Sequence, residues 1–114
     1  MKTSSLFITL SLLLFISILT YAKEPASKTS FKVNGSCDMC KERIEIAAKA
    51  KGVKSIDWNI DTHIATLVFY SSKISLDQIL QNIARAGYDT DKYKASDSAY
   101  HELPKCCQYE RKTD

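Results

Sequence analysis

The stretch VKSIDWNIDTHIATLVFY, from Val53 to Tyr70, contains two runs in which apolar and polar residues alternate, separated by the turn DTH. Alternation with a period of two is typical of strands that bury one face, and a short polar turn between two such runs predicts an antiparallel hairpin. In this register Trp58 and Leu67 point to the same face of the sheet. The segments on either side of the hairpin must supply what covers that face.

A helix is predicted on each side of the hairpin. The preceding segment DMCKERIEIAAKAKG has Asp38 as its candidate N-cap, an apolar stripe, and Gly52 as its stop. The following segment opens with the capping box SLDQ at Ser75, continues with apolar residues at helical spacing, and stops at Gly87. Both helices are expected to cover the same face of the sheet.

Two outer strands complete the predicted order. The first is SFKVNG, from Ser30 to Gly35, and the last is a short strand within DTDKYKA, from Asp89 to Ala95. The resulting βαββαβ order is that of an α+β ferredoxin-like sandwich, an antiparallel four-stranded sheet with two helices on one face. Its predicted core residues are Ile56, Trp58, Leu67, Phe69, Ile79, Leu80 and Ile83, while Ile64, Val68 and Tyr70 are expected on the open face of the sheet.

The amino terminus is predicted to be a signal peptide, residues 1–22, with Lys2, an uncharged apolar run from Leu6 to Leu19, and a cleavage site after Ala22. The run is shorter than the ~20 residues that a spanning helix needs, so no transmembrane segment is expected after cleavage. We therefore expect a protein exported to the periplasm or secreted. Residues 23–29 are expected to form a flexible leader, residues 30–94 the domain, and residues 95–114 a cysteine-containing tail.

Composition excludes several classes of function. The chain has 114 residues, 45% of them apolar, which is ordinary for one small globular domain, and its formal net charge of +3 is too weak to argue for a nucleic-acid partner. No group of residues in it resembles a Ser-His-Asp site or a phosphate-binding loop. The sequence therefore predicts a protein that is not an enzyme.

Cys37 and Cys40 form a C-x-x-C pair where the first strand leads into the first helix. Such a pair can be a metal clamp, a redox-active dithiol or a structural disulfide, although a bridge closing so small a loop would stabilise little. The amino end of a helix favours the thiolate form, and Lys41 and Arg43 add positive charge nearby. Two adjacent thiolates suit a soft ion of low coordination number, Cu(I) or Hg(II), whereas a closed Zn(II) site needs two further ligands.

The tail SDSAYHELPKCCQYERKTD contains two more cysteines, Cys106 and Cys107. If Pro104 turns the chain back toward the C-x-x-C loop, one or both of these thiols become additional metal ligands. Otherwise they pair with each other, with the first dithiol, or with a second molecule. His63 and His101 are expected to face the solvent rather than to bind a metal.

Three stretches together resemble the heavy-metal-associated domain family: VNGSCDMCKERIE, GVKSIDWNIDTHIATLVFY and ISLDQILQNIARAGYDT. That family includes copper chaperones, modules of metal-pumping ATPases and periplasmic mercury-binding proteins. The resemblance implies that Cys37 and Cys40 are the ligands, with Cu(I) favoured and Hg(II) or Zn(II) as the alternatives. It also implies a carrier that gives its ion to a metal-transporting membrane protein or another metal-binding domain, and it allows a metal-bridged dimer.

The sequence departs from the family pattern inside the loop. The family commonly has a Met between the loop glycine and the residue before the first cysteine, whereas here Ser36 alone stands between Gly35 and Cys37. Met39, within the motif, is expected to pack inward in its place, with a thioether ligand as the alternative. Asp38 between the cysteines would favour a harder ion such as Zn(II), but helix capping accounts for it without a metal.

Two other functions compete with the carrier. An exported C-x-x-C at a helix start is also found in thiol-disulfide oxidoreductases, which would reduce insulin in a reaction that requires Cys37. A sensor module that docks on a membrane transporter would bind no metal itself. Reduced protein that failed to bind Cu(I), Hg(II) or Zn(II) would favour the sensor.

Overall fold

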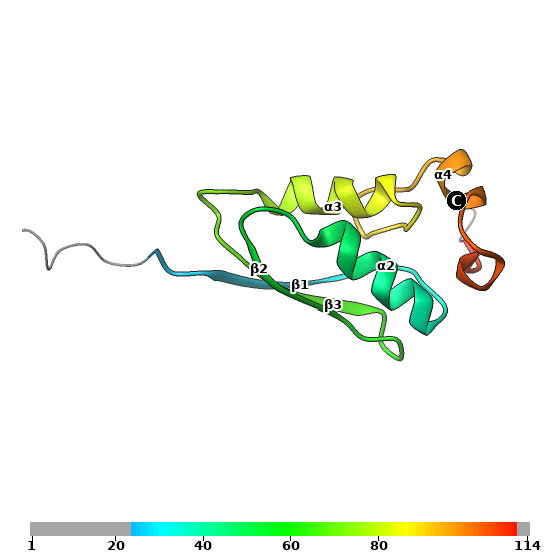
Figure 1. Cartoon of the computed structure of the whole chain (residues 1–114), viewed down its shortest axis with the longest axis horizontal. Helices are drawn as coiled ribbons and strands as arrows, with labels where there is room; N and C mark the ends of the chain where they lie inside the picture. Colours follow the sequence, from blue (N-terminus) through cyan, green and yellow to red (C-terminus); the bar gives the residue numbers. More distant parts are fainter. Residues whose placement is uncertain (1–23, 112–114) are drawn as a thin grey trace, which may run out of the picture.

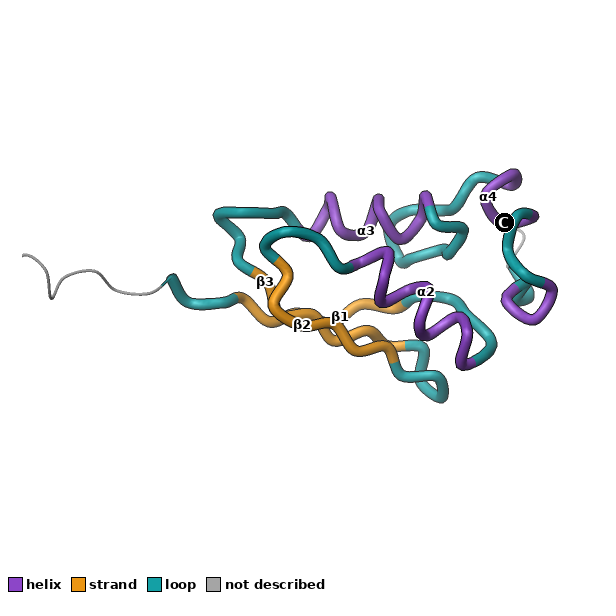
Figure 2. The backbone as a smooth tube through the Cα atoms, viewed as in Figure 1, coloured by secondary structure: helices purple, strands orange, loops and turns teal. Residues whose placement is uncertain are grey.

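A computed structural model describes residues 24–111, so the predicted signal peptide lies outside the described residues. Strands β1 (Ser27–Lys32), β2 (Val53–Trp58) and β3 (Ile64–Phe69) form an antiparallel sheet in the order β1-β3-β2. Helices α2 (Asp38–Ala48) and α3 (Leu76–Arg85) cover one face of this sheet, as Figures 1 and 2 show. The short helix α4 (Asp97–His101) and the 3-10 turn η1 (Lys105–Cys107) lie at the end of the domain where α2 begins.

The predicted hairpin is confirmed, with Trp58 opposite Ala65 and Ile56 opposite Leu67. Its turn is closed by the Asn59 side chain, whose Oδ1 accepts hydrogen bonds from two backbone N–H groups of the turn. His63 has a φ of 61°, and its ring stacks on Trp58 with 5.5 Å between ring centroids. The hairpin therefore places Trp58 under the helices, as its alternation predicts.

The core lies between the sheet and the two helices. All of the predicted core residues are buried except Ile56, which is half-buried and packs against the others. Trp58 is fully buried, and its Nε1–H donates a hydrogen bond of 3.0 Å to the carbonyl oxygen of Val33. Ile64 is exposed on the other face of the sheet, with Val68 and Tyr70 half-buried there.

The prediction of a fourth strand is wrong for the described residues, in which the sheet has three strands. The segment after α3 makes one isolated bridge, between Val33 and Thr90, and then turns away. The turn is stabilised by Thr90, whose N–H donates to the Tyr93 carbonyl at 2.8 Å and whose Oγ1 accepts the Tyr93 N–H at 3.0 Å. A local hydroxyl bond of this kind competes with sheet pairing, and the fold is a three-stranded variant of the ferredoxin-like sandwich.

The first strand begins earlier than predicted. Ser27 to Thr29, expected in the flexible leader, already pair with Phe69 to Leu67 of β3. The reason is that β3 is the central strand, and its full length offers backbone partners to a neighbour on that side. Phe31 and Val33, which alternate with the polar Lys32 and Asn34 in SFKVNG, are both buried on the core side of the sheet.

The helix ends agree only in part with the sequence prediction. At α3 the Ser75 hydroxyl accepts the N–H of Gln78 at 3.1 Å, as predicted, and Gly87 follows the helix with a φ of 108°. At α2 the N-cap is Cys37 rather than Asp38, and no side chain caps it. Asp38 is instead the first helical residue, where its charge is favourable to the helix dipole.

The residues after Ala95 are folded onto the domain. Leu103, Cys107 and Tyr109 are buried and belong to the same hydrophobic cluster as the residues of the sandwich. Within residues 24–111, no helix has both the length and the apolar character required to cross a membrane.

Candidate metal centre

The C-x-x-C loop is held at its entrance by backbone contacts. Asn34 N–H donates to the Asp89 carbonyl at 2.9 Å, just after the bridge between Val33 and Thr90. Gly35 then crosses the edge of the buried indole, where an added Cβ would lie 3.0 Å from two ring atoms of Trp58. A larger residue at this position would lift the loop, so the glycine and the tryptophan together fix where Cys37 begins α2.

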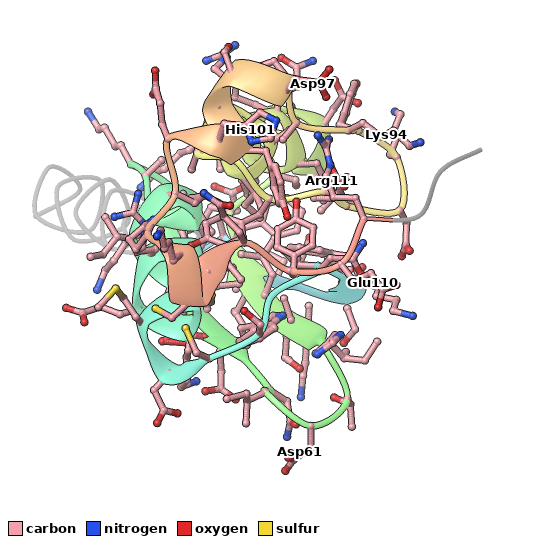
Figure 3. All side chains as sticks on the ribbon, turned by 90° about the vertical axis from the view of Figure 1, so that its right-hand side faces the viewer. Asp61, Lys94, Asp97, His101, Glu110 and Arg111 are labelled. Atoms are coloured by element: carbon pink, nitrogen blue, oxygen red, sulfur yellow. The ribbon has the colours of Figure 1, made fainter. Side chains whose placement is uncertain are left out.

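The four cysteine sulfurs gather at this end of the molecule. Cys37 Sγ lies 3.3 Å from Cys40 Sγ, 3.5 Å from Cys106 Sγ and 3.6 Å from Cys107 Sγ, and the two tail sulfurs are 4.0 Å apart. None of the four cysteines is in a disulfide. Figure 3 looks at this end, where yellow sulfur atoms gather between α2 and the C-terminal ribbon. Cys37 is therefore the shared neighbour of the other three thiols.

Three of these sulfurs form a compact group. The ligand atoms of Cys37, Cys40 and Cys107 all lie within 4.8 Å of one another, and Cys106 lies at the edge of this group. Metal–sulfur bonds of about 2.3 Å place sulfurs about 3.8 to 4.0 Å apart in a three- or four-coordinate site, but about 4.6 Å apart around a linear ion. The distances of 3.3 to 3.6 Å at Cys37 are nearer to the higher coordination numbers.

Exposure divides the cysteines into two pairs. Cys40 and Cys107 are fully buried, whereas Cys37 is half-buried and Cys106 is exposed. Burial raises the pKa of the Cys107 thiol, and its hydrogen-bond contact with Cys40 raises it further. The buried pair is thus shielded from solvent, and the outer pair is accessible to incoming reagents.

Tyr88 lies behind the buried sulfurs. Its side chain is fully buried, and its hydroxyl has no hydrogen-bond partner of ordinary geometry among the described residues. Burial raises the pKa of Tyr88, followed in effect by its proximity to Cys107, so the hydroxyl remains protonated. A protonated phenol is a hydrogen-bond donor, and a thiolate at Cys107 would give it an acceptor.

Several predicted features of the site differ in the structure. Met39 does not pack inward: its side chain is 48% exposed and its Sδ lies 4.0 Å from Cys106 Sγ. The Lys41 ammonium lies 2.8 Å from a carboxylate oxygen of Asp57 and 2.8 Å from one of Glu45. The hydrogen bond to Asp57, followed by that to Glu45, raises the pKa of Lys41, so its charge is directed at these carboxylates.

The predicted non-ligands are away from the sulfurs. His63, which was expected to face the solvent, is instead half-buried and stacks on Trp58 in the hairpin turn, whereas His101 is exposed, as expected, and packs edge-on against Tyr100. Neither histidine is part of the compact cysteine group among residues 24–111.

Two residues beside the cysteines were not expected from the sequence. Ser36, noted only as a departure from a pattern, donates from its hydroxyl to the Cys106 carbonyl at 2.5 Å and lies 3.7 Å from Cys40 Sγ. Tyr88, quoted only within a family motif, is the orphan donor behind Cys107. A polar side chain that contacts a site from elsewhere in the chain produces no periodic pattern in the sequence. The one sequence feature that includes Tyr88 is the AGY at the end of the family stretch ISLDQILQNIARAGYDT.

Comparison with protein families gives one clear match. Residues 30–89 match the heavy-metal-associated domain, which is more than half of the chain and includes the C-x-x-C loop, both strands of the hairpin and α3. The match ends before α4 and η1, so Cys106 and Cys107 lie outside it.

Individual relatives agree with this match. The chain is 35% identical over 60 residues to a protein named copper chaperone CopZ from Staphylococcus epidermidis, covering 51% of this chain and 88% of that protein. A solved structure of a CopZ metallochaperone has a TM-score of 0.54 at 32% identity, covering 56% of this chain and 98% of that one. The structure of oxidized MerP from Ralstonia metallidurans also has a TM-score of 0.54, at 26% identity, with 58% and 94% of the two chains covered.

Proposed function

Because this chain belongs to the heavy-metal-associated domain family, we propose that it is a non-enzymatic carrier that binds a soft heavy-metal ion through Cys37 and Cys40. The observation that carries the proposal is the 3.3 Å separation of these two sulfurs at the start of α2, beside solvent. Two thiolates held this close form a chelate for a soft ion without any rearrangement of the core.

We favour Cu(I) as the cargo, with Hg(II) and Zn(II) as the competing ions. Thiolate ligands select Cu(I) and other soft metals, and within residues 24–111 the compact cysteine group includes no carboxylate or imidazole, the ligands that harder ions prefer. The similarity to proteins named copper chaperones points the same way. Similarity to MerP is the support for Hg(II).

Transfer by ligand exchange fits the exposure of the site. An acceptor thiolate forms a bond to the ion while one protein thiolate leaves and takes up a proton, and the oxidation state of the metal does not change. Cys37 is half-buried whereas Cys40 is fully buried, so Cys37 is the more accessible of the two ligands. The acceptor is a metal-transporting membrane protein or another metal-binding domain.

The proposed setting is outside the cytoplasm, after removal of residues 1–22. In an oxidising compartment unprotected thiols pair readily, so a carrier there must keep its dithiol reduced or filled. The functional unit is the domain of residues 27–94, which includes all of β1, together with the tail of residues 95–114.

The proposal is tested by anaerobic competition of the reduced protein for Cu(I), Hg(II) and Zn(II) against chelators of known affinity. We expect one soft ion per chain, with Cu(I) bound in preference to Zn(II). His101→Gln is the matched control, because it removes an exposed imidazole outside the compact cysteine group and leaves every sulfur in place, and it should bind as the unmodified protein does. A reduced protein that binds none of the three ions would contradict the carrier function and favour a sensor.

A further inference from the structure

The segment 96–111, called here the C-terminal segment, is docked by polar contacts that involve no sulfur. Arg111 donates from Nε to Asp89 Oδ2 at 2.9 Å and from Nη2 to Asp89 Oδ1 at 2.8 Å. Its Nη2 also donates to the Ala95 carbonyl at 2.6 Å, and its Nη1 lies 3.0 Å from Asp97 Oδ1. Figure 3 shows Arg111 on this side of the segment, with Asp97 above it. A bidentate pair of this kind between a guanidinium and a carboxylate fixes the orientation of the two groups as well as their distance.

A second anchor is the hydroxyl of Tyr109. It accepts a hydrogen bond from the Asp89 N–H at 2.8 Å and donates one to the Gly87 carbonyl at 2.9 Å. The buried hydroxyl therefore acts as both acceptor and donor. The ring of Tyr109 is buried and packs edge-on against Tyr100. These contacts tie the end of the segment to the turn that follows α3.

The packing of the segment also depends on Gly87. Its φ of 108° is one that glycine tolerates, and an added Cβ would lie 2.8 Å from the Ala99 carbonyl and 3.0 Å from the Leu103 side chain. Leu103 is buried in the core cluster. The C-terminal segment therefore packs closely against the domain at Gly87, where a side chain would collide with it.

The docked segment brings its cysteines to the C-x-x-C loop. Cys107 is buried 3.6 Å from Cys37, beside the unpartnered hydroxyl of Tyr88, whereas Cys106 is exposed 3.5 Å from Cys37. Ser36 joins the two parts directly through its bond to the Cys106 carbonyl. The anchors would hold both sulfurs in place even if no metal were bound.

From these contacts we propose that the C-terminal segment is a built-in ligand arm of the metal site. Cys107 is the third metal ligand, a buried thiolate that accepts a hydrogen bond from the Tyr88 hydroxyl. Cys106 is the outer thiolate through which the ion enters and leaves. The inference rests on the proposed function at Cys37 and Cys40, and it adds a three-sulfur site where the C-x-x-C loop alone offers two sulfurs.

In this ligand arm, Cys107 retains the ion and Cys106 begins its exchange with an acceptor. During release the Cys106 thiol gives up its proton and bonds to the ion, the bond to Cys107 breaks, and the Cys107 sulfur takes up a proton. Acceptor thiolates then bond to the ion as the bonds to Cys106 and the remaining cysteines break in turn, and each released sulfur takes up a proton. A tethered ligand acts at an effective concentration in the millimolar range, so the arm retains an ion against dilute competitors and yields it to a docked dithiol.

The test uses Cu(I) as the probe, loaded anaerobically on reduced full-length protein, with X-ray absorption for the sulfur count and a Cu(I) chelator for affinity. The unmodified protein should show three sulfur neighbours. Cys107→Ser should show two and should hold Cu(I) about tenfold less tightly or worse, because the tethered ligand is gone. Lys105→Gln, an exposed neighbour on the same turn, should match the unmodified protein.

A second variant covers the risk that Cys107→Ser fails to fold. Asp89→Asn loosens the arm without removing any sulfur, and it should also lower the sulfur count and weaken retention. Cys106→Ser should keep the three-sulfur signature but transfer Cu(I) more slowly to dithiothreitol. Two sulfurs in the unmodified protein, with equal affinity in Cys107→Ser, would overturn the ligand arm and leave the carrier function standing. A protein that binds no soft ion would overturn both.

Discussion

The sulfur of Cys107 lies 3.6 Å from the sulfur of Cys37, although the two residues are 70 positions apart in the chain. The family match ends at residue 89, so this contact joins a family loop to a segment outside the family's boundary. The contact depends on a folded C-terminal segment rather than on local sequence, and most of the predictions below examine that dependence.

The first prediction concerns thiol reactivity. In the reduced, metal-free protein, iodoacetamide should modify Cys106 first and Cys37 next, because these thiols are exposed and half-buried. Cys40 and Cys107 should react slowly, since both are fully buried. Peptide mass spectrometry after timed quenching gives the order. Modification of Cys107 as fast as Cys106 would show that the C-terminal segment is not docked in solution.

A second prediction follows from the ion pair of Asp89 and Arg111. Burial disfavours the charged form of Asp89, but hydrogen bonds from Arg111 and from the Ala95 N–H outweigh it and hold the pKa of this carboxyl below its usual 3.8. A lowered folded-state pKa gives stability that is present above the unfolded-state pKa and is lost as the pH falls through the folded-state pKa. The C-terminal segment should therefore undock below pH 3.8, as NMR signals of Tyr109 would report.

Asp89→Asn should remove this acid step and should release the segment at neutral pH, with faster modification of Cys107. Asp77→Asn is the matched control, because the pKa of Asp77 is also lowered, first by Lys92 and then by Tyr93, at a site on α3 away from the sulfurs. Equal acid behaviour of both variants and the unmodified protein would contradict the role of Asp89 as the anchor.

A third prediction tests the core. Trp58→Ala should cost about 3 to 5 kcal/mol of unfolding free energy, the usual loss for a buried large aromatic residue. Trp58→Phe keeps most of the buried volume but leaves the Val33 carbonyl without its donor, and it should cost less. Urea unfolding measures both. The folded protein should also show tryptophan emission shifted to shorter wavelength, and emission like that of indole in water would contradict the register of β2.

The sequence was sufficient for the elements whose signal is local. The alternation in the hairpin and the spacing of Ile79 and Ile83 in α3 depend only on neighbouring residues, so both elements were predicted correctly. The prediction of a fourth strand was wrong because the Thr90 hydroxyl accepts the Tyr93 N–H and stabilises a turn in place of a strand. The pattern DTDKYKA does not show whether this local hydrogen bond or pairing with the sheet is the more stable.

Within the candidate site, the C-x-x-C pair was visible as a motif, but its surroundings were not. Lys41 was expected to support the thiolates, yet it pairs with Asp57, which only the packing of α2 on β2 brings near, and with Glu45, four residues further along the same helix. Met39 was expected inside and lies outside beside Cys106. The return of the tail was one of several alternatives, because its anchors Asp89 and Arg111 are 22 residues apart and follow no periodic pattern.

A fourth prediction compares two glycines. Gly87→Ala and Gly52→Ala should each cost roughly 1 to 3 kcal/mol, because both residues have a positive φ and an added Cβ would meet an atom at 2.8 Å. Only Gly87→Ala should also speed the modification of Cys107, since its Cβ would meet Ala99 and Leu103 of the C-terminal segment. Equal Cys107 reactivity in the two variants would show that the docking of the C-terminal segment does not depend on Gly87.

The central claim is that Cys37 and Cys40 are the primary ligands of a soft metal ion. The most direct measurement is the anaerobic Cu(I) affinity of the double variant Cys37→Ser/Cys40→Ser beside that of the unmodified protein, with circular dichroism to confirm that both are folded. We predict that tight Cu(I) binding is lost while the double variant stays folded, with a lowered thermal midpoint because Cys40 is buried in the core cluster. Undiminished Cu(I) affinity in the folded double variant would contradict the claim.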